Sequence, residues 1–126
     1  MLHGHLREDE QAVVAFDLIC REGSRSSVEA VIDTGFNGQV SLSRKGVSTL
    51  DLALAVEGTI EMELASGAVV EEQVYSGSIH FDGQTLSVEI ILTNAEDSFI
   101  GTGLLTGKVR LINFATREVT IQDHRS

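Results

Sequence analysis

Val31-Ile32-Asp33-Thr34-Gly35 is the stretch that decides the fold, because an apolar run stops there at a carboxylate. Residues 29–32 have the pattern of a strand, and residues 34–38, Thr-Gly-Phe-Asn-Gly, supply two glycines and an asparagine that permit a tight turn. The stretch therefore predicts an acid in a constrained loop at a strand end, a common position for functional side chains. Taken alone, Asp-Thr-Gly predicts only an Asx-type turn opened by Asp33, since this tripeptide occurs by chance in many turns.

The composition around this stretch is that of one acidic globular domain. With 126 residues, 42% of them hydrophobic, the chain is long enough to bury a core. A net charge of −10, with only nine scattered lysines and arginines, argues against binding to nucleic acid or to anionic membranes. Cys20 is the only cysteine, so no intrachain disulfide can form and a buried, inert thiol is expected.

The first ten residues are polar and acidic and contain no apolar core of the kind that a signal peptide needs. No other window approaches the length of a membrane span. We therefore expect a cytoplasmic protein with a flexible segment at 1–10, followed by one domain at 11–126. Two histidines in that segment, His3 and His5, could serve a metal-dependent hydrolase, but four ligands are not evident and a frayed terminus is the expected state.

Most of the remaining chain alternates apolar and polar residues, which predicts short strands. These cover residues 12–20, 28–33, 39–43, 59–64, 69–75, 78–81, 86–92, 109–114 and 119–122. The strands between 59 and 75 are expected to form a hairpin with its tip near Ser66-Gly67. Helical spacing of apolar residues predicts a short helix over 45–54. Many short strands with short connections predict a mostly β barrel or sandwich and exclude a doubly wound parallel sheet.

Two motifs of other enzyme classes are incomplete. Gly101-Thr102-Gly103 begins like a dinucleotide-binding loop, but the next glycine, Gly107, comes one residue too late and no crossover helix is predicted. A serine triad lacks its Gly-x-Ser-x-Gly elbow. We therefore expect neither a nucleotide cofactor nor a serine nucleophile.

The order of three motifs resembles the single-domain, retropepsin-like aspartic proteases, in particular their small bacterial and cyanobacterial type. Asp33-Thr34-Gly35 comes first, the glycine-tipped hairpin second, and Phe99-Ile100-Gly101-Thr102-Gly103-Leu104-Leu105 third, followed by the predicted strand 109–114. Each motif alone is weak, whereas their order and separation are moderately specific. The resemblance implies a closed, single-lobed β-barrel of the acid-protease fold with one or two short helices.

The same resemblance implies an aspartic endopeptidase that needs no metal or cofactor. One chain carries one such loop, so the family pattern implies a homodimer in which two Asp33 carboxylates share a proton and activate a water molecule. Thr34 would bond to the loop of the partner, and Gly35 would offer backbone groups to the substrate. The partners expected are therefore a second copy and a peptide or protein substrate, with no nucleic acid and no membrane.

Substrate-binding residues also follow from the resemblance. The hairpin around Ser66 and Gly67 would close over an extended peptide, with Phe36, Ile100 and Leu42 lining its pockets beside Asn37. The alternative for Phe36, Ile100 and Leu42 is ordinary core packing. Phe36 stands where the family usually has alanine or serine, which would narrow the cleft.

Two further features separate this chain from the retroviral members. Asn37 and Thr102 stand where those members have a paired acid and arginine; because both charges are absent, neither leaves the other buried alone. The predicted hairpin is crowded with glutamates, which usually mark a solvated face; they are Glu57, Glu61, Glu63, Glu71 and Glu72. The alternative to an enzyme is a non-catalytic β-barrel dimerisation or peptide-binding module in which Asp33 only shapes its loop.

Overall fold

Strand β3 (Arg25–Ile32) carries the chain into the Asp33 loop, and its neighbour in the sheet comes from late in the sequence. The computed structural model describes residues 1–124. In it, β8 (Ser98–Ile100) lies between β3 and β4 (Val40–Ser43), parallel to the first and antiparallel to the second. The two strands that flank the loop are therefore held apart by a third, which fixes the width of the loop between them.

Six strands close into a barrel around this arrangement. The other strands are β1 (Leu2–Leu6), β2 (Ala12–Ile19), β5 (Ala55–Glu63), β6 (Val69–Phe81), β7 (Gln84–Thr93), β9 (Lys108–Asn113) and β10 (Glu118–Asp123). The sheet order is β5-β6-β7-β4-β8-β3-β2-β1-β10-β9, and an additional pairing of β6 with β2 closes the ring. Helix is limited, in residues 1–124, to a 3-10 turn at Arg21–Gly23 and to α1 (Thr102–Leu105). The predicted mostly β, closed barrel with one or two short helices is confirmed.

The barrel is filled by the inward faces of these strands. The largest fully buried side chains are Phe81, Leu18, Leu42, Ile79, Ile90, Ile100, Ile121, Val13, Val14, Val40, Val119 and Ser43. Cys20 is buried in the same core, as the sequence predicts. Burial of apolar surface on this scale is the main stabilising contribution to the fold.

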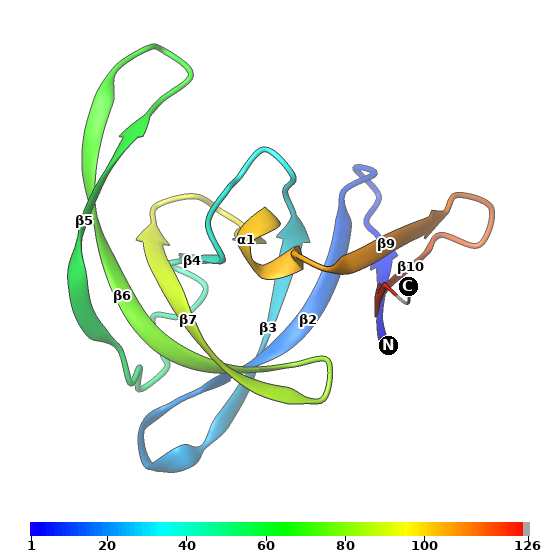
Figure 1. The fold of residues 1–126 in the computed structure, drawn as a ribbon, viewed down its shortest axis with the longest axis horizontal. Helices are drawn as coiled ribbons and strands as arrows, with labels where there is room; N and C mark the ends of the chain where they lie inside the picture. Colours follow the sequence, from blue (N-terminus) through cyan, green and yellow to red (C-terminus); the bar gives the residue numbers. More distant parts are fainter. Residues whose placement is uncertain (125–126) are drawn as a thin grey trace.

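The first ten residues are not a loose segment, which corrects the sequence-based expectation. Leu2–Leu6 form β1, which pairs with β2 on one side and with β10 on the other, so that β9 ends the sheet next to β10 (Figure 1). Leu6 is buried in the core. The strand was hidden in the sequence because its main partner, β10, lies at the opposite end of the chain.

The predicted helix over 45–54 is also absent. Residues 44–49 form successive turns, and Leu52 makes an isolated antiparallel bridge with Cys20. Val47 is buried, which accounts for the apolar spacing, but glycine, serine and threonine in this segment are poor helix formers, so the N–H of Gly46, which donates to Ser43 Oγ at 3.2 Å, begins a series of turns and not a helix. Packing against the barrel therefore determines the segment's path.

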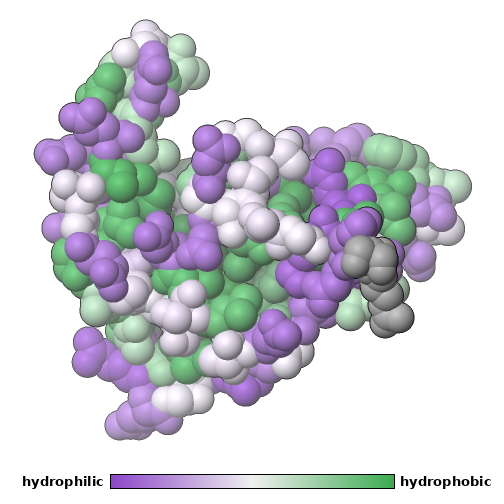
Figure 2. All heavy atoms as spheres, in the orientation of Figure 1, coloured by the Kyte–Doolittle hydropathy of each residue, from purple (hydrophilic) through white to green (hydrophobic). Residues whose placement is uncertain are grey.

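The β5–β6 hairpin extends beyond the barrel as an arm (Figure 1). In the space-filling view the arm stands clear of the body and carries both hydrophilic and hydrophobic side chains (Figure 2). Along it, Val56, Ile60, Leu64 and Val69 are exposed. A two-stranded ribbon with so few buried contacts is expected to open and close at low energetic cost.

Candidate active site

The loop that carries Asp33 is held at both ends by the last residue of β8 and by the residue that follows it. The backbone N–H of Asp33 donates to the carbonyl of Ile100 at 2.9 Å, which continues the pairing of β3 with β8. The N–H of Phe36 donates to the carbonyl of Asp33 at 3.2 Å and closes a turn. At the far end, the N–H of Gly101 donates to the carbonyl of Gln39 at 3.0 Å. Backbone bonds therefore fix where the carboxylate emerges.

The carboxylate of Asp33 is half-buried, and only one of its oxygens is engaged. Oδ1 accepts the backbone N–H of Gly35 at 2.9 Å, the Asx-type contact that the tripeptide predicts. No hydrogen bond from residues 1–124 reaches Oδ2. The backbone thus orients the group while one oxygen stays open to a water molecule or to a substrate carbonyl.

Gly101 and Gly103 pack closely against the backbone of the Asp33 loop. This packing is the role of the Gly-x-Gly motif, which the sequence analysis excluded as a dinucleotide-binding loop. The N–H of Thr102 donates to the carbonyl of Phe36 at 2.8 Å, and that of Gly103 to the carbonyl of Gly38 at 3.1 Å. Contacts this close leave no room for a side chain: a Cβ on Gly101 would overlap the carbonyl oxygens of Phe36 and Gly38. The motif therefore permits close backbone packing.

Neutral contacts occupy the positions of the missing charged pair. The Thr102 hydroxyl donates to the Phe36 carbonyl at 3.4 Å, and the Asn37 side chain is exposed. Thr102 thus reinforces the backbone of the loop and does not bond to Asn37. No charge is buried without a counterion in this arrangement.

Thr34 lies exposed on the loop beside a hollow of about 490 Å³. The other residues around this hollow come from α1, β9, β10 and the α1–β9 turn: Thr102, Leu105, Thr106, Lys108, Arg110 and Ile121. The Thr34 hydroxyl has no hydrogen-bond partner within residues 1–124. It is available to a group from another molecule.

A groove of about 290 Å³ lies between the Asp33 loop and the arm. Residues 35–40 of the loop form one wall, and residues 60–63 of β5 form the other. Val74, Ile91 and Glu89, from β6 and β7, complete it. The groove is open, lined by both apolar and acidic residues, and begins two residues from Asp33.

The predicted substrate-binding residues divide between the groove and the arm's tip. Phe36 and Asn37 line the groove. Ser66 and Gly67 form the tip, where the N–H of Gly67 donates to the carbonyl of Leu64 at 2.8 Å. In this structure the tip does not line the groove, so contact of Ser66 or Gly67 with a substrate requires the arm to move.

Ile100 does not line a pocket, contrary to the sequence-based expectation. Its side chain is 0% exposed and fills the core under the loop. The residue acts through its backbone carbonyl, which accepts the N–H of Asp33. An apolar residue before a glycine fits either location, and only the β3–β8 register, with Ile32 opposite Ile100, turns it inward.

The groove also contains residues that the sequence reasoning missed. Ile60 and Met62 had a signal, since the alternation in 59–64 places them on one face of a strand. Glu89, Val74 and Ile91 had none, because their position depends on the pairing of β6 with β7 and on the path of the arm over them.

Arg7 lies on the other side of the Asp33 loop, in a hollow of about 340 Å³ that Asp33 also lines. Its Nη1 donates to Asp97 Oδ1 and its Nη2 to Asp9 Oδ2, both at 2.7 Å. The bonds to Asp97 and then Asp9 raise the pKa of the guanidinium, and the bond from Arg7 lowers the pKa of the Asp9 carboxyl. The stabilisation from Asp9 is therefore present at neutral pH and is lost as the pH falls through its lowered pKa.

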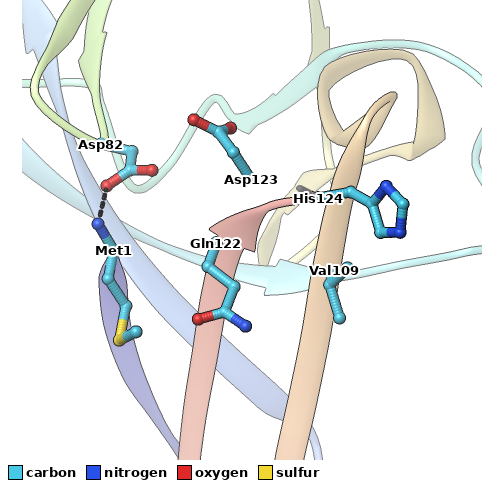
Figure 3. A pocket seen from close by; sticks show the side chains of 6 residues that line it. All are labelled: Met1, Asp82, Val109, Gln122, Asp123 and His124. Carbon is cyan, nitrogen blue, oxygen red and sulfur yellow. Dashed lines mark ion pairs between the residues drawn. The ribbon is translucent and has the colours of Figure 1, made fainter. Parts of the chain in front are cut away.

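A hollow of about 560 Å³ lies near the termini (Figure 3). Its lining residues are Met1, Asp82, Val109, Gln122, Asp123 and His124. The N-terminal ammonium lies 2.9 Å from Asp82 Oδ1, and Lys108 Nζ lies 2.6 Å from Asp123 Oδ1. The N-terminus thus pairs with the β6–β7 turn and β9 pairs with β10, and no predicted site residue lines this hollow.

His3 and His5 are both exposed on β1. Among the side chains of residues 1–124, no group of three or more His, Cys, Asp or Glu is arranged to hold a metal ion. None of the helices in that part of the chain is long and apolar enough to cross a bilayer.

Comparison with known proteins identifies the fold through structure alone. No family model and no curated protein matches the sequence. The crystal structure of a retropepsin-like aspartic protease from Rickettsia conorii is similar, with a TM-score of 0.64 and 12% identity over 95% of this chain and 88% of that one. EIAV protease complexed with the inhibitor HBY-793 is similar with a TM-score of 0.56 and 11% identity, over 79% of this chain and 89% of that one.

The closed barrel, the position of β8 between β3 and β4, and the two structural neighbours together define a single-lobed domain of the retropepsin-like fold. The fold expected from the order of the three motifs is thereby confirmed. At 11–12% identity the similarity extends to the fold and not to an activity.

Proposed function

We propose that this protein is an aspartic endopeptidase that is active as a homodimer, each chain supplying one Asp33-Thr34-Gly35 loop. The observation that carries the proposal is the Asp33 carboxylate, held by backbone bonds at the end of β3 with Oδ2 open, next to a groove bordered by a projecting arm. A fold shared with aspartic proteases supports it.

A second chain is needed because the proposed step uses an ionised and a protonated carboxyl group at the same time, and one Asp33 can supply only one of these forms. Two Asp33 groups facing each other about a two-fold axis at ~4 Å would repel by about 4 kcal/mol at an effective dielectric constant of about 20. The pair would therefore keep one proton between them. The ionised member would take a proton from water while the protonated member bonds to the scissile carbonyl, and the roles would reverse as the intermediate collapses.

The surrounding residues have roles consistent with this mechanism. The open hydroxyl of Thr34 would bond to the partner's loop and hold the two acids in register. An extended peptide would lie in the groove along Gly35 to Gly38, with its backbone bonded like an added strand. The arm, through Ser66 and Gly67, would close over the peptide and exclude water from the acids.

The homodimer predicts that the cleavage rate per chain depends on protein concentration. Well below the dimer dissociation constant, a tenfold dilution should lower the rate per chain about tenfold, because the dimer population falls with the square of the concentration. The measurement is cleavage of an unfolded, quenched fluorescent protein at mildly acidic pH in the presence of a chelator. A rate per chain that is independent of dilution, in a sample shown by sedimentation to be monomeric, would contradict the proposal.

The same assay separates the alternatives. Loss of cleavage on adding the chelator would indicate a metal-dependent hydrolase. Binding of unfolded protein without cleavage at any pH between about 4 and 8 would favour the non-catalytic peptide-binding module, in which the bond from Gly35 to Asp33 only shapes the loop.

A further inference from the structure

The groove has a directional arrangement of apolar and acidic side chains that follows from strand register. Residues directly opposite in an antiparallel pair share a face of the sheet. Ile60 pairs with Glu72, and Val74 pairs with Ile91, so these four residues face the same side. Glu89, two residues before Ile91, lies on that side too. On this face the apolar pair Val74–Ile91 therefore has a carboxylate on each side of it along the strands, Glu72 on one side and Glu89 on the other, and Glu89 lines the groove.

Within residues 1–124 these carboxylates form no ion pair with a lysine, an arginine or the N-terminus. No lysine or arginine occurs between Gly46 and Gly107, the part of the sequence that contains β5, β6 and β7. No ion pair within residues 1–124 involves Glu72 or any of the three acids that line the groove, which are Glu61, Glu63 and Glu89. All lysines and arginines of the chain lie outside this part of the sequence, and several of them form ion pairs with other acids.

An apolar groove rimmed by unpaired carboxylates favours one kind of ligand. The spacing from Ile91 to Glu89 equals the spacing between alternate side chains of an extended peptide, roughly 7 Å. We propose that the groove selects extended polypeptide segments in which an apolar residue has a lysine or arginine within two positions. The apolar side chain covers Val74 and Ile91 while the cation reaches Glu89 or Glu72. This selectivity rests on the proposed function for its role in cleavage, but peptide binding can be measured without cleavage.

The test compares three fluorescent peptides that share one apolar pair and differ in the flanking residues, which are lysine, glutamine or glutamate. Binding is measured by fluorescence anisotropy with the full chain carrying Asp33→Asn, and cleavage with the unchanged chain. Each carboxylate is expected to contribute about two- to fivefold, so the lysine peptide should bind on the order of tenfold more tightly than the glutamine peptide at low salt. The glutamate peptide should bind most weakly, and high salt should reduce the differences.

Two matched double variants assign the effect to the groove. Glu72→Gln with Glu89→Gln should reduce the advantage of the lysine peptide to about twofold or less. Glu22→Gln with Glu118→Gln changes the net charge equally but alters the exposed Arg21–Gly23 turn and β10, neither of which lines the groove, so the advantage should persist. Equal affinities for the lysine and glutamine peptides, or equal losses in both double variants, would overturn the proposal.

Cleavage then separates this proposal from the proposed function. Equal binding and equal cleavage of all three peptides would refute the selectivity and leave the endopeptidase intact. Preferential binding of the lysine peptide without cleavage of any peptide would support the selectivity and refute the endopeptidase.

Discussion

Substitution Asp33→Asn is expected to abolish peptide cleavage, lowering kcat/KM by at least ~10³-fold, while the domain stays folded. Loss of activity follows because an amide can neither take a proton from water nor share one with a second acid. Retention of the fold follows because the amide oxygen can still accept the N–H of Gly35, and because Asp33 is half-exposed rather than in the core. A thermal melt within a few degrees of the unchanged protein, together with loss of cleavage, would establish that the defect is chemical.

The matched control is Asp51→Asn. Asp51 is an exposed acid whose ion pair with Arg21 lies on the surface, so removing its charge should leave both stability and cleavage nearly unchanged. Cleavage that persists in Asp33→Asn above the level of a mock preparation would refute the acid dyad.

Mixing the two proteins tests whether both acids of a dimer are required. In an equal mixture that exchanges freely, about a quarter of the dimers contain two unchanged chains, so the activity should fall to about a quarter of that of the unchanged protein at the same total concentration. A chain that works alone would retain about half. The comparison needs no structure of the dimer, and it separates a shared site from two independent ones.

The local elements of this fold were predictable because their signals are local. Alternating residues predicted most strands, and Asp-Thr-Gly after an apolar run predicted the loop. The order of the motifs predicted a retropepsin-like barrel through its resemblance to that family, whereas the position of β8 between β3 and β4 was not predicted from the residues. The arm was predicted because its two strands and its turn are contiguous in sequence, so its signal is local too.

The predictions that failed, and the groove residues that were missed, depend on contacts between distant parts of the chain. Residues 1–10 contain a strand because β10 pairs with it, and nothing in Leu2–Leu6 alone reports that partner. Ile100 was placed in a pocket because its neighbours carry the family motif, whereas its register opposite Ile32 turns it into the core. Glu89 entered the groove only through the pairing of β6 with β7.

The role of the Gly-x-Gly motif at 101–103 also depends on a distant part of the chain. The sequence correctly excluded a nucleotide loop, since a third glycine and a crossover helix are missing. It could not supply the actual reason for the glycines, which is the approach of the Asp33 loop across the top of β8. Because of this close approach, we expect a large effect when a side chain is added at Gly101.

Gly101→Ala is expected to destabilise the domain by about 3 kcal/mol and to displace the Asp33 loop. The backbone of Gly101 is extended, with φ −110° and ψ −179°, so any residue could adopt its conformation and the constraint is one of space alone. An added Cβ would meet the carbonyl oxygens of Phe36 and Gly38, and it would lie 2.6 Å from Cδ2 of the Phe36 ring. Because two of these three atoms belong to the backbone, the overlap can be relieved only by moving the loop, which places the cost at the upper end of that for overpacking.

The control for this variant is Gly58→Ala in the arm. A Cβ at Gly58 would have no atom within 4 Å, so its effect on unfolding should be within about 0.5 kcal/mol of zero. Chemical denaturation measures both variants, and cleavage adds a second reading: Gly101→Ala should lose activity even at temperatures where it is fully folded, because the carbonyl of Ile100 and the N–H of Gly101 hold the two ends of the loop. If Gly101→Ala matched Gly58→Ala in stability and cleaved at the original rate, the loop would not be positioned by these contacts, and the rigid placement of Asp33 from which the mechanism follows would be wrong.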